Sequence, residues 1–413
     1  MRALQPLPDD SIYLQTLTIP AQSNPACPAF APGSTVTLDK SLTLPPGCRY
    51  ERLTLRINKP GITLDCNGAL LNGLDSPERQ PAGRAYASGQ APQTYAILIA
   101  GHENAARPVR NVTVRNCQLL NYRTAVLIVM GMEPATYARA RRDGQVKAAA
   151  QLQSKAPGDI RLDNLSIVNS HDTGVYLQRF VSGVSLENSR ILGSGGVGLY
   201  LEAGTRDALI RNNRFEGNGF ASYDAQSRQR SRRLSDTVRR EAIAVDGSQY
   251  NTIRANLFRN NADGGVYLYK NCWEHADSKA REMPRDGGAD HNLIEDNRFE
   301  NETTGVWLAE RADRDLSGFH CGDPLYAAKG TAKFYRDYAQ YNTVRGNQFT
   351  GNQVGIRVQD DHNTLTANRF EDAEEADIVI GSRIRRQQDQ PVRETELQDN
   401  RLSSAQGVVY LSR

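Results

Sequence analysis

The sequence predicts an all-β solenoid, a single domain in which short strands coil around one axis and stack coil on coil. Two short signatures alternate from about Asn111 onward, and each alternates apolar with polar residues like a half-buried strand. Where insertions are absent, a signature recurs after 21 residues, as from Asn342 to Asn363, or after 24, as from Gly174 to Gly198. This period suits one coil of two or three strands and is too short for a helix pair or a propeller blade.

The first signature has the form N-x-[IVL]-x-x-N-x-F. Clear copies are NTIRANLF at Asn251, NLIEDNRF at Asn292, NTVRGNQF at Asn342 and NTLTANRF at Asn363, and looser copies are ALIRNNRF at Ala208 and TELQDNRL at Thr395. Asn tolerates left-handed backbone, and its amide can bond to the Asn of the next coil, so we expect an Asn ladder at a turn of the solenoid. The hairpins of an up-and-down barrel would not repeat one turn residue in register.

The second signature, G-[VI]-x-[LV]-x, places two columns of side chains on the outer face of one sheet. The first column reads Tyr176, Tyr200, Ala244, Tyr267, Trp307 and Arg357, and the second reads Gln178, Glu202, Asp246, Tyr269, Ala309 and Gln359. Adjacent coils lie about 4.8 Å apart, so each column forms a continuous strip. Aromatic rings suit the apolar faces of sugars, and carboxylates and amides bind hydroxyls. We therefore expect substrate contacts from Tyr176, Tyr200, Tyr267, Trp307 and Arg357, with ordinary cross-strand packing as the alternative.

These repeats resemble those of right-handed parallel β-helix proteins, the pectate-lyase-like group that includes pectin and alginate lyases, mannuronan epimerases, polygalacturonases and phage tailspikes. The resemblance covers Asn111 to Arg413, and GITLDCNGALLNG at Gly61 resembles an earlier coil. It implies a single-stranded right-handed parallel β-helix over residues 61–413, with residues 1–60 as an N-terminal cap of the same domain. It also implies a polysaccharide ligand. The reaction motifs of epimerases and polygalacturonases are not present in order, because DPLY at Asp323 lacks the histidine of D-P-H-D and DDH at Asp360 stands alone.

Three long insertions interrupt consecutive coils next to the strip, between Gly219 and Arg240, between Asn271 and His291, and between Arg311 and Gln340. Loops that leave a rigid scaffold often carry function, so we expect these to wall the strip, although they could merely cover the sheet. An earlier insertion, Ala138 to Gln153, has the composition of a helix.

The six cysteines predict disulfides and an oxidising compartment. None has C-x-x-C spacing, and the chain contains Cys27, Cys48, Cys66, Cys117, Cys272 and Cys321. We expect bridges from Cys27 to Cys48 and from Cys272 to Cys321, and Cys66 and Cys117 form either a third bridge or two free thiols. A periplasmic or secreted location follows, with an export signal already removed, because no apolar segment follows Met1.

Charge and hydropathy limit the classes of molecule that the protein is expected to bind. The net charge is only +3, which does not suggest nucleic-acid binding, and no apolar run approaches the ~20 residues that cross a bilayer. Basic residues gather in SRQRSRRLSDTVRR, from Ser227 to Arg240. This local patch favours an anionic polysaccharide. The sequence gives no indication of the oligomeric state.

Two reactions fit the residues beside the strip, and the basic segment favours the first of them. Elimination or C5 epimerisation of a uronate needs a base and a cation. We assign the catalytic roles to Tyr269, Lys270 and His275, and we expect Arg311 and His320 nearby to bind the substrate. Hydrolysis by inversion instead needs two carboxyl groups, which Asp246 could form with Glu202 or with Glu310. A non-catalytic glycan-binding β-helix is the third possibility.

No cofactor is expected. Asp360, Asp361 and His362 could contribute to a Ca²⁺ site, but Ca²⁺ takes six to eight oxygen ligands and the sequence supplies few here. A charged turn is the simpler interpretation.

Overall fold

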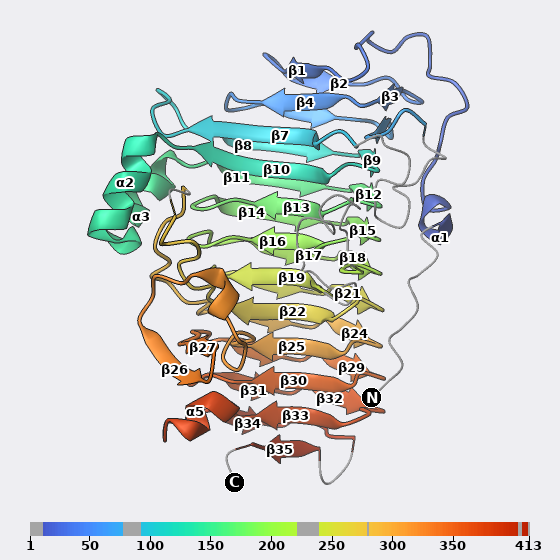
Figure 1. The fold of residues 1–413 in the computed structure, drawn as a ribbon. Helices are drawn as coiled ribbons and strands as arrows, with labels where there is room; N and C mark the ends of the chain where they lie inside the picture. Colours follow the sequence, from blue (N-terminus) through green and yellow to red (C-terminus); the bar gives the residue numbers. More distant parts are fainter. Residues whose placement is uncertain (1–10, 77–91, 221–238, 279–280, 404–406, 412–413) are drawn as a thin grey trace.

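The structure, a computed structural model, describes residues 11–76, 92–220, 239–278, 281–403 and 407–411. In these residues the strands enter three long sheets in rotation, one strand per sheet per coil, and all pairings within the three sheets are parallel (Figure 1). This is the predicted all-β solenoid. Its hydrophobic core fills the space that the three sheets enclose.

Sheet A carries the second signature. Its strands, in spatial order, are β1 (Thr35–Thr37), β4 (Thr54–Ile57), β7 (Tyr95–His102), β10 (Thr124–Gly131), β13 (Thr173–Leu177), β16 (Leu199–Leu201), β19 (Glu241–Asp246), β22 (Gly264–Tyr269), β25 (Thr304–Leu308), β30 (Val354–Val358), β33 (Ala376–Ile380) and β35 (Val408–Tyr410).

Sheets B and C share the first signature. Sheet B consists of β2 (Leu42–Thr43), β5 (Thr63–Asp65), β8 (Arg110–Arg115), β11 (Gly158–Asp163), β14 (Ser182–Glu187), β17 (Leu209–Arg211), β20 (Thr252–Arg254), β23 (Leu293–Glu295), β28 (Thr343–Arg345), β31 (Thr364–Thr366) and β34 (Glu396–Gln398). Sheet C consists of β3 (Arg49–Glu51), β6 (Leu70–Asn72), β9 (Gln118–Leu120), β12 (Ser166–Val168), β15 (Arg190–Leu192), β18 (Arg214–Glu216), β21 (Leu257–Arg259), β24 (Arg298–Glu300), β29 (Gln348–Thr350) and β32 (Arg369–Glu371).

The Asn of the repeat forms the predicted ladder at the bend between sheets B and C. Each side-chain amide donates to the amide oxygen of the next coil at 3.0 to 3.1 Å, through Asn213, Asn256, Asn297, Asn347, Asn368 and Asn400. The Phe of the same signature stacks inside, with ring centroids 4.7 to 5.2 Å apart, through Phe215, Phe258, Phe299, Phe349 and Phe370. The repeat therefore satisfies buried polar groups at the bend and fills the core beside it.

The solenoid begins earlier than the predicted boundary at residue 61. Strands β1 to β4 lie within residues 35–57 and already pair with the sheets that follow them. Ahead of them, α1 (Ser11–Leu14) places Tyr13 against Leu70, Leu120 and other apolar residues on the outside of sheet C. The Pro-rich N-terminal segment therefore contributes a first coil as well as a covering segment.

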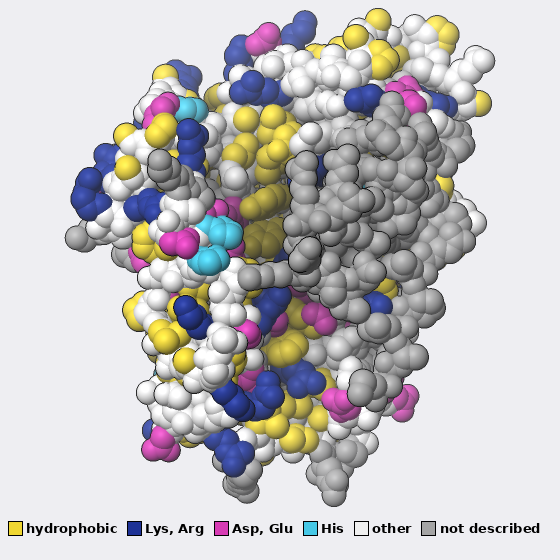
Figure 2. Space-filling model, in the orientation of Figure 1, with side chains coloured by type: hydrophobic (Ala, Val, Ile, Leu, Met, Phe, Trp, Pro, Cys, Tyr) yellow, Lys and Arg dark blue, Asp and Glu magenta, His cyan; other side chains and the backbone are white. Residues whose placement is uncertain are grey.

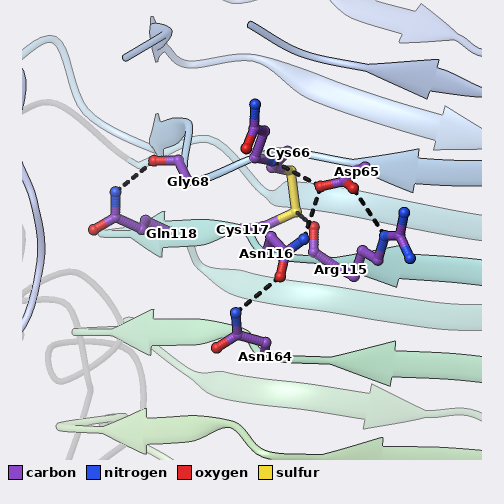
Figure 3. Close-up of a disulfide and its surroundings, with 9 residues drawn as sticks. Asp65, Cys66, Gly68, Arg115, Asn116, Cys117, Gln118 and Asn164 are labelled. Atoms are coloured by element: carbon purple, nitrogen blue, oxygen red, sulfur yellow. Dashed lines mark hydrogen bonds and ion pairs between the residues drawn. A yellow bond between two sulfur atoms is a disulfide. The ribbon is translucent and has the colours of Figure 1, made fainter. Parts of the chain in front are cut away.

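Disulfides tie neighbouring coils and insertions. The bridges Cys27–Cys48 and Cys272–Cys321 are confirmed, and Cys66 and Cys117 form the third bridge, which had been one of two alternatives. The Cys66–Cys117 bridge joins two adjacent coils at the bend between sheets B and C, beside an ion pair of Asp65 with Arg115 (Figure 3).

Two insertions lie beside the outer face of sheet A (Figure 1). The predicted helical segment forms α2 (Pro134–Asp143) and α3 (Gln145–Lys155), which follow β10. The third long insertion forms the 3-10 turn η2 (Ser317–Phe319) and the antiparallel hairpin of β26 (Leu325–Lys329) and β27 (Ala332–Tyr335). A short helix, α5 (Arg383–Gln387), follows β33. Among the described helices, none combines the length and apolar character that a membrane crossing requires.

Candidate functional site

The first predicted column stands in register on the outer face of sheet A, whereas the second is interrupted, because Ala309 packs into the hydrophobic core. Strand pairing aligns Tyr176, Tyr200, Ala244, Tyr267, Trp307 and Arg357 on successive coils. Figure 2 shows apolar side chains along this face, next to the side that carries α2, α3 and the β26–β27 hairpin. The predicted strip therefore exists as a surface feature.

Exposure differs along the strip. Tyr176, Tyr200, Trp307 and Arg357 are partly exposed, whereas Ala244 and Tyr267 are buried. The Tyr176 and Tyr200 rings meet edge to face at 5.1 Å, and the Arg357 guanidinium lies over the Trp307 ring at 5.2 Å. The partly exposed rings can contact a sugar, while Tyr267, at 1% exposure, supports its neighbours from below.

An acidic and basic cluster lies beside Tyr176 and Tyr200. The Tyr176 hydroxyl donates to Glu202 at 2.9 Å, and the Tyr200 hydroxyl donates to Asp246 at 2.6 Å. The Arg179 Nε donates to Glu202 at 3.0 Å, and Arg285, from the second insertion, forms an ion pair with Asp246. Glu202 and Asp246, which the sequence paired as catalytic carboxyls, are thus both held by arginines.

Asp246 remains ionised at neutral pH. Its complete burial tends to raise the pKa, but the Arg285 guanidinium and the Tyr200 hydroxyl outweigh burial and hold the pKa below its ordinary value. Its carboxylate also accepts the backbone N–H of Asn271 at 2.9 Å and the side-chain amide of Asn271 at 3.0 Å. This degree of hydrogen bonding fixes the carboxylate and the start of the second insertion to each other.

A second cluster lies one coil further along, around Tyr269. The Tyr269 hydroxyl donates to Glu241 at 3.0 Å, and the Arg240 Nε donates to the same carboxylate at 3.1 Å. The Arg311 guanidinium lies over the Tyr269 ring at 4.4 Å and forms a 3.2 Å ion pair with Glu310. Burial tends to raise the pKa of Glu241, but Arg240 lowers it below its usual value, so this carboxylate is ionised at neutral pH.

Asp263 differs from the other carboxyls of this face. It immediately precedes β22, is partly exposed, and its backbone oxygen accepts the Tyr267 hydroxyl at 2.7 Å. Desolvation and the charges of Glu241 and Glu310 raise the pKa of Asp263 to about 7. Burial also raises the pKa of Glu310. The face thus combines an ionised carboxylate, Glu241, with a carboxyl that holds its proton near neutrality.

Lys270 lies apart from the strip, beneath the third insertion. Its side chain is 8% exposed, with the Nζ 3.0 Å from Asp323. The backbone N–H of Lys270 donates to Asp337 at 2.6 Å, and Asp337 also accepts the backbone N–H of Arg311 at 2.7 Å. Through these contacts Lys270 anchors the third insertion. Its role as a base stays a prediction.

His275 and His320 come together at the rim. The His275 backbone N–H donates to the Phe319 oxygen at 3.0 Å, and the Cys272–Cys321 bridge joins the two insertions next to them. The imidazole of His320 lies 3.2 Å from Asp277, with about half of the side chain exposed. Both histidines are surface residues of the joined insertions, and their roles in catalysis and binding stay predictions.

Sequence reasoning missed several residues of this face, namely Arg179, Arg240, Glu241, Asp263 and Arg285. Glu241 and Asp263 precede the second signature, where the alternating pattern gives no side-chain direction, and Arg285 lies inside an insertion. The one available signal was the acidic residue before each of two neighbouring copies, EAIAVD and DGGVYLY. The basic segment Ser227 to Arg240 lies outside the described residues except for its last two positions.

The carboxylates proposed for Ca²⁺ are paired with arginines. Asp360 lies 2.7 Å from Arg336 and 2.9 Å from Arg385, and Asp361 lies 2.7 Å from Arg385. His362 lies 2.7 Å from Glu394. These contacts account for both carboxylates without a cation. Within the described parts of the chain, no three His, Cys, Asp or Glu side chains are grouped so that they could hold a metal ion.

Comparison with known proteins shows the fold. Residues 95–272 match the model of the right-handed beta helix region, and residues 283–390 match that of the periplasmic copper-binding protein NosD. No curated protein sequence matches the chain significantly.

Similar solved structures include three carbohydrate-related proteins. The catalytic domain of GH87 alpha-1,3-glucanase is 12% identical, with coverage of 91% of this chain and 56% of that chain and a TM-score of 0.40. The Family 28 exopolygalacturonase of Yersinia enterocolitica is 11% identical, with coverage of 90% and 66% and a TM-score of 0.47. The periplasmic alginate epimerase AlgG, as a mutant, is 12% identical, with coverage of 90% and 79% and a TM-score of 0.43.

The chain spans 56% to 66% of the length of the first two of these structures. The match of residues 95–272 to a right-handed beta helix region and the three parallel sheets show that the chain has the fold of a right-handed parallel β-helix.

Proposed function

We propose that this chain is an exported carbohydrate-active enzyme that binds an extended polysaccharide along the outer face of sheet A and cleaves it there. The partly exposed rings of Tyr176, Tyr200 and Trp307 supply apolar surface for sugar rings, at a coil spacing of about 4.8 Å. The polar groups beside them are held rigidly by ion pairs and hydrogen bonds, as a site that must orient a substrate requires.

The reaction best supported by the geometry is acid–base hydrolysis of a glycosidic bond. The observation that carries it is a pair of carboxyls on adjacent coils: Glu241 pairs in register with Gly264, and Asp263 directly precedes Gly264. The pKa of Asp263 is raised to about 7, and the pKa of Glu241 is lowered. Two carboxyls whose pKa values are driven apart by their surroundings are the general arrangement of an acid and its ionised partner. Asp263 would donate its proton to the glycosidic oxygen. The charge of Glu241, which is buried beside it, would keep the proton on Asp263, and the partly exposed Glu310 would stabilise the positive charge on the sugar.

This proposal changes the carboxyl pair that the sequence suggested. Asp246 is fully buried and accepts hydrogen bonds from Tyr200, Asn271 and Arg285. We therefore give it the role of holding these side chains in place beneath the substrate. Glu202 has the same role beside Tyr176 and Arg179. Glu310, which is partly exposed and close to Asp263, remains within reach of a substrate.

Elimination or epimerisation of an acidic polysaccharide is the second candidate. Arg240 and Arg311 lie on the same face, and cations there could neutralise the carboxylate of a uronate. The tyrosines are poor bases, because burial and neighbouring carboxylates raise the pKa of Tyr267 and Tyr269 well above the usual range. Each of the two arginines already has a carboxylate partner, which makes hydrolysis the stronger proposal.

Copper chemistry, which the name of the NosD model suggests, does not fit the described residues of the matched region. His291 is stacked between Tyr250 and Tyr341, and His320 and His362 each face a carboxylate. Among the described residues of this region, no three His, Cys, Asp or Glu side chains are grouped as a metal site requires.

A periplasmic or extracellular location agrees with the three disulfides, which persist in oxidising compartments. We include this location in the proposal.

The function is tested on a panel of polysaccharides that contains polygalacturonate, alginate, an α-1,3-glucan and a β-1,4-glucan. Released reducing ends and the ultraviolet absorbance of unsaturated products are measured in parallel. Hydrolysis predicts new reducing ends without the absorbance, and elimination predicts both. Binding without either product would show a non-catalytic glycan-binding protein, and absence of both binding and products on every polymer would overturn the proposal.

A further inference from the structure

The bend between sheets B and C carries a groove that the proposed reaction does not use. A hollow of about 520 Å³ is lined by three side-chain columns: the left-handed turn residues, the buried Asn ladder and the first residue of each strand of sheet C. A second hollow of about 600 Å³ continues it toward the N-terminal coils, with Thr16, Thr18 and Pro20 as part of its wall. Arg190 lines both hollows and therefore lies where they meet.

The first hollow arises where the repeat is interrupted. The turn position carries Asn188, Asn212, Ala255 and Asp296 on successive coils, and the sheet C position carries Arg190, Arg214, Leu257 and Arg298. At φ 53°, Ala255 adopts a left-handed conformation without a side chain that could continue the amide ladder. The partly exposed Leu257 lies beside it. The coil that contains Ala255 therefore lacks a polar side chain at the turn, and Leu257 gives the hollow an apolar floor there.

Polar groups surround this floor at the spacing of the coils. Asn212 donates to Asn188 at 2.8 Å, and Asn164 donates to Asn116 at 2.8 Å in the second hollow (Figure 3). Asn164 and Asn212 each use the amide nitrogen in these bonds, which leaves the amide oxygen turned to solvent as an acceptor for hydroxyl groups.

The three arginines of the groove are not equivalent. Arg214 is paired with Glu216, and Arg298 with Glu300. Arg190 is exposed and has no ion pair within the described residues. A guanidinium in this state can bind a carboxylate through two parallel hydrogen bonds.

We propose that this groove is a second, non-catalytic binding site for an extended acidic saccharide. Arg190 would bind the carboxylate of one sugar, Leu257 would contact the apolar face of a neighbouring ring, and the amide oxygens would accept hydroxyl hydrogens. Extended polysaccharides present such groups once per sugar, a repeat close to the coil spacing of about 4.8 Å. The described walls of the groove carry no aromatic ring on which a nucleic-acid base would stack.

The test measures binding of a short oligogalacturonate by isothermal titration calorimetry, in an Asp263→Asn background that suppresses turnover. Ala255→Asn restores the amide ladder in a residue type that accepts left-handed backbone, so it fills the hollow without a loss of stability. We expect Arg190→Gln to weaken binding at one site about tenfold or more, because it removes a charge-assisted hydrogen bond. Ala255→Asn should weaken binding at the same site by a similar factor, because its side chain fills the hollow. Arg369→Gln, an exposed arginine on the last strand of sheet C, is the matched control and should bind like the background protein.

Three outcomes would overturn the proposal: equal binding by Ala255→Asn and the control, equal affinity for a neutral cello-oligosaccharide, or no measurable binding of oligogalacturonate. The thermal midpoint of Ala255→Asn, expected to be unchanged or higher, separates loss of binding from unfolding. Cleavage of polysaccharide by Ala255→Asn with Asp263 intact is a separate readout, so failure of this site is distinguishable from failure of the proposed function.

Discussion

The inner and outer sides of the same coils differ in how strictly one residue type is repeated. Inside, one residue type, Phe, stacks through five successive coils with ring planes 6° to 9° apart. Outside, the aligned column of sheet A changes from Tyr200 to Ala244, Tyr267, Trp307 and Arg357 within five coils. The same residue type recurs inside because every coil must fill the same space in the core. Side chains on the outer face do not have to fill a fixed space, so they can differ from coil to coil.

The difference is also energetic. Stacked apolar rings gain free energy from burial and lose no charge hydration, whereas a buried ion pair such as Arg285 with Asp246 must offset the loss of hydration of two charges. Several such pairs lie together on the outer face around Tyr200 and Tyr269. Departures from local stability rules concentrate at functional sites, which supports the assignment of this face as the active site.

Removal of the proposed acid should produce the largest difference between a residue of the outer face of sheet A and a residue elsewhere on the solenoid. Asp263→Asn should reduce kcat by about 10²–10⁴-fold, the usual contribution of a general acid, with little change in the unfolding midpoint. Activity is measured as released reducing ends. Glu371→Gln, an exposed carboxyl on β32 of sheet C, is the matched control and should retain full activity. Equal activity of both variants would remove Asp263 from the site.

Truncation of a side chain inside the solenoid should lower stability and leave catalysis nearly unchanged, the reverse of Asp263→Asn. Phe299→Ala removes the central ring of the stack, so we expect a loss of about 3–5 kcal/mol in the free energy of unfolding. The activity of the folded fraction should remain close to that of the unchanged protein. Phe319→Ala, in the partly exposed 3-10 turn of the third insertion, should cost clearly less in a denaturant titration.

The disulfides permit a comparison between the insertions and the core. Replacement of both Cys272 and Cys321 by Ser frees the two joined insertions, and we expect a raised KM together with about 2–4 kcal/mol lower stability. The matching double replacement at Cys66 and Cys117 should lower stability by a similar amount and leave KM unchanged. An unchanged KM in both double variants would show that the insertions do not line the substrate path.

The pH dependence of the reaction follows from the proton on Asp263. Because the protonated form is the active one and its pKa is about 7, kcat/KM should fall by up to tenfold per pH unit above neutrality. Glu371→Gln should follow the same curve. A rate that stays constant between pH 6 and pH 9 would exclude Asp263 as the acid.

Glu302 offers a smaller effect on stability. It stands in an Asn ladder, accepts the amide of Asn261 at 2.8 Å, and is fully buried, which raises the pKa to about 8. A raised pKa contributes stability that is complete below the unfolded value of 4.5 and is lost as the pH rises toward 8. Glu302→Gln should therefore be more stable than the unchanged protein at pH 9, by about 1 kcal/mol or more, and equal to it at pH 4. Equal stability of the two proteins at both pH values would show that Glu302 carries no such proton.

The repeats sufficed to predict the fold. Alternation and the recurring Asn gave the parallel coils, the ladder and the alignment of the outer column, and two disulfide pairings were predicted correctly. These features depend on local periodicity, which a sequence displays directly.

The site was less predictable for a physical reason. Spacing places Lys270 next to the strip, but its side chain pairs with Asp323, 53 residues away. Arg285 reaches Asp246 from within an insertion, and the proton on Asp263 depends on charges from two other coils. Such long-range contacts have no periodic signal, so the residues that set the chemistry emerged only from the structure.

The most direct test is a crystal structure of the Asp263→Asn variant with an oligosaccharide derived from its best substrate. We predict that the sugar chain crosses the outer face of sheet A over Tyr200 and Trp307, with a glycosidic oxygen within hydrogen-bonding distance of residue 263. Sugar bound only elsewhere on the molecule, with this face empty, would contradict the assignment of the outer face of sheet A as the active site.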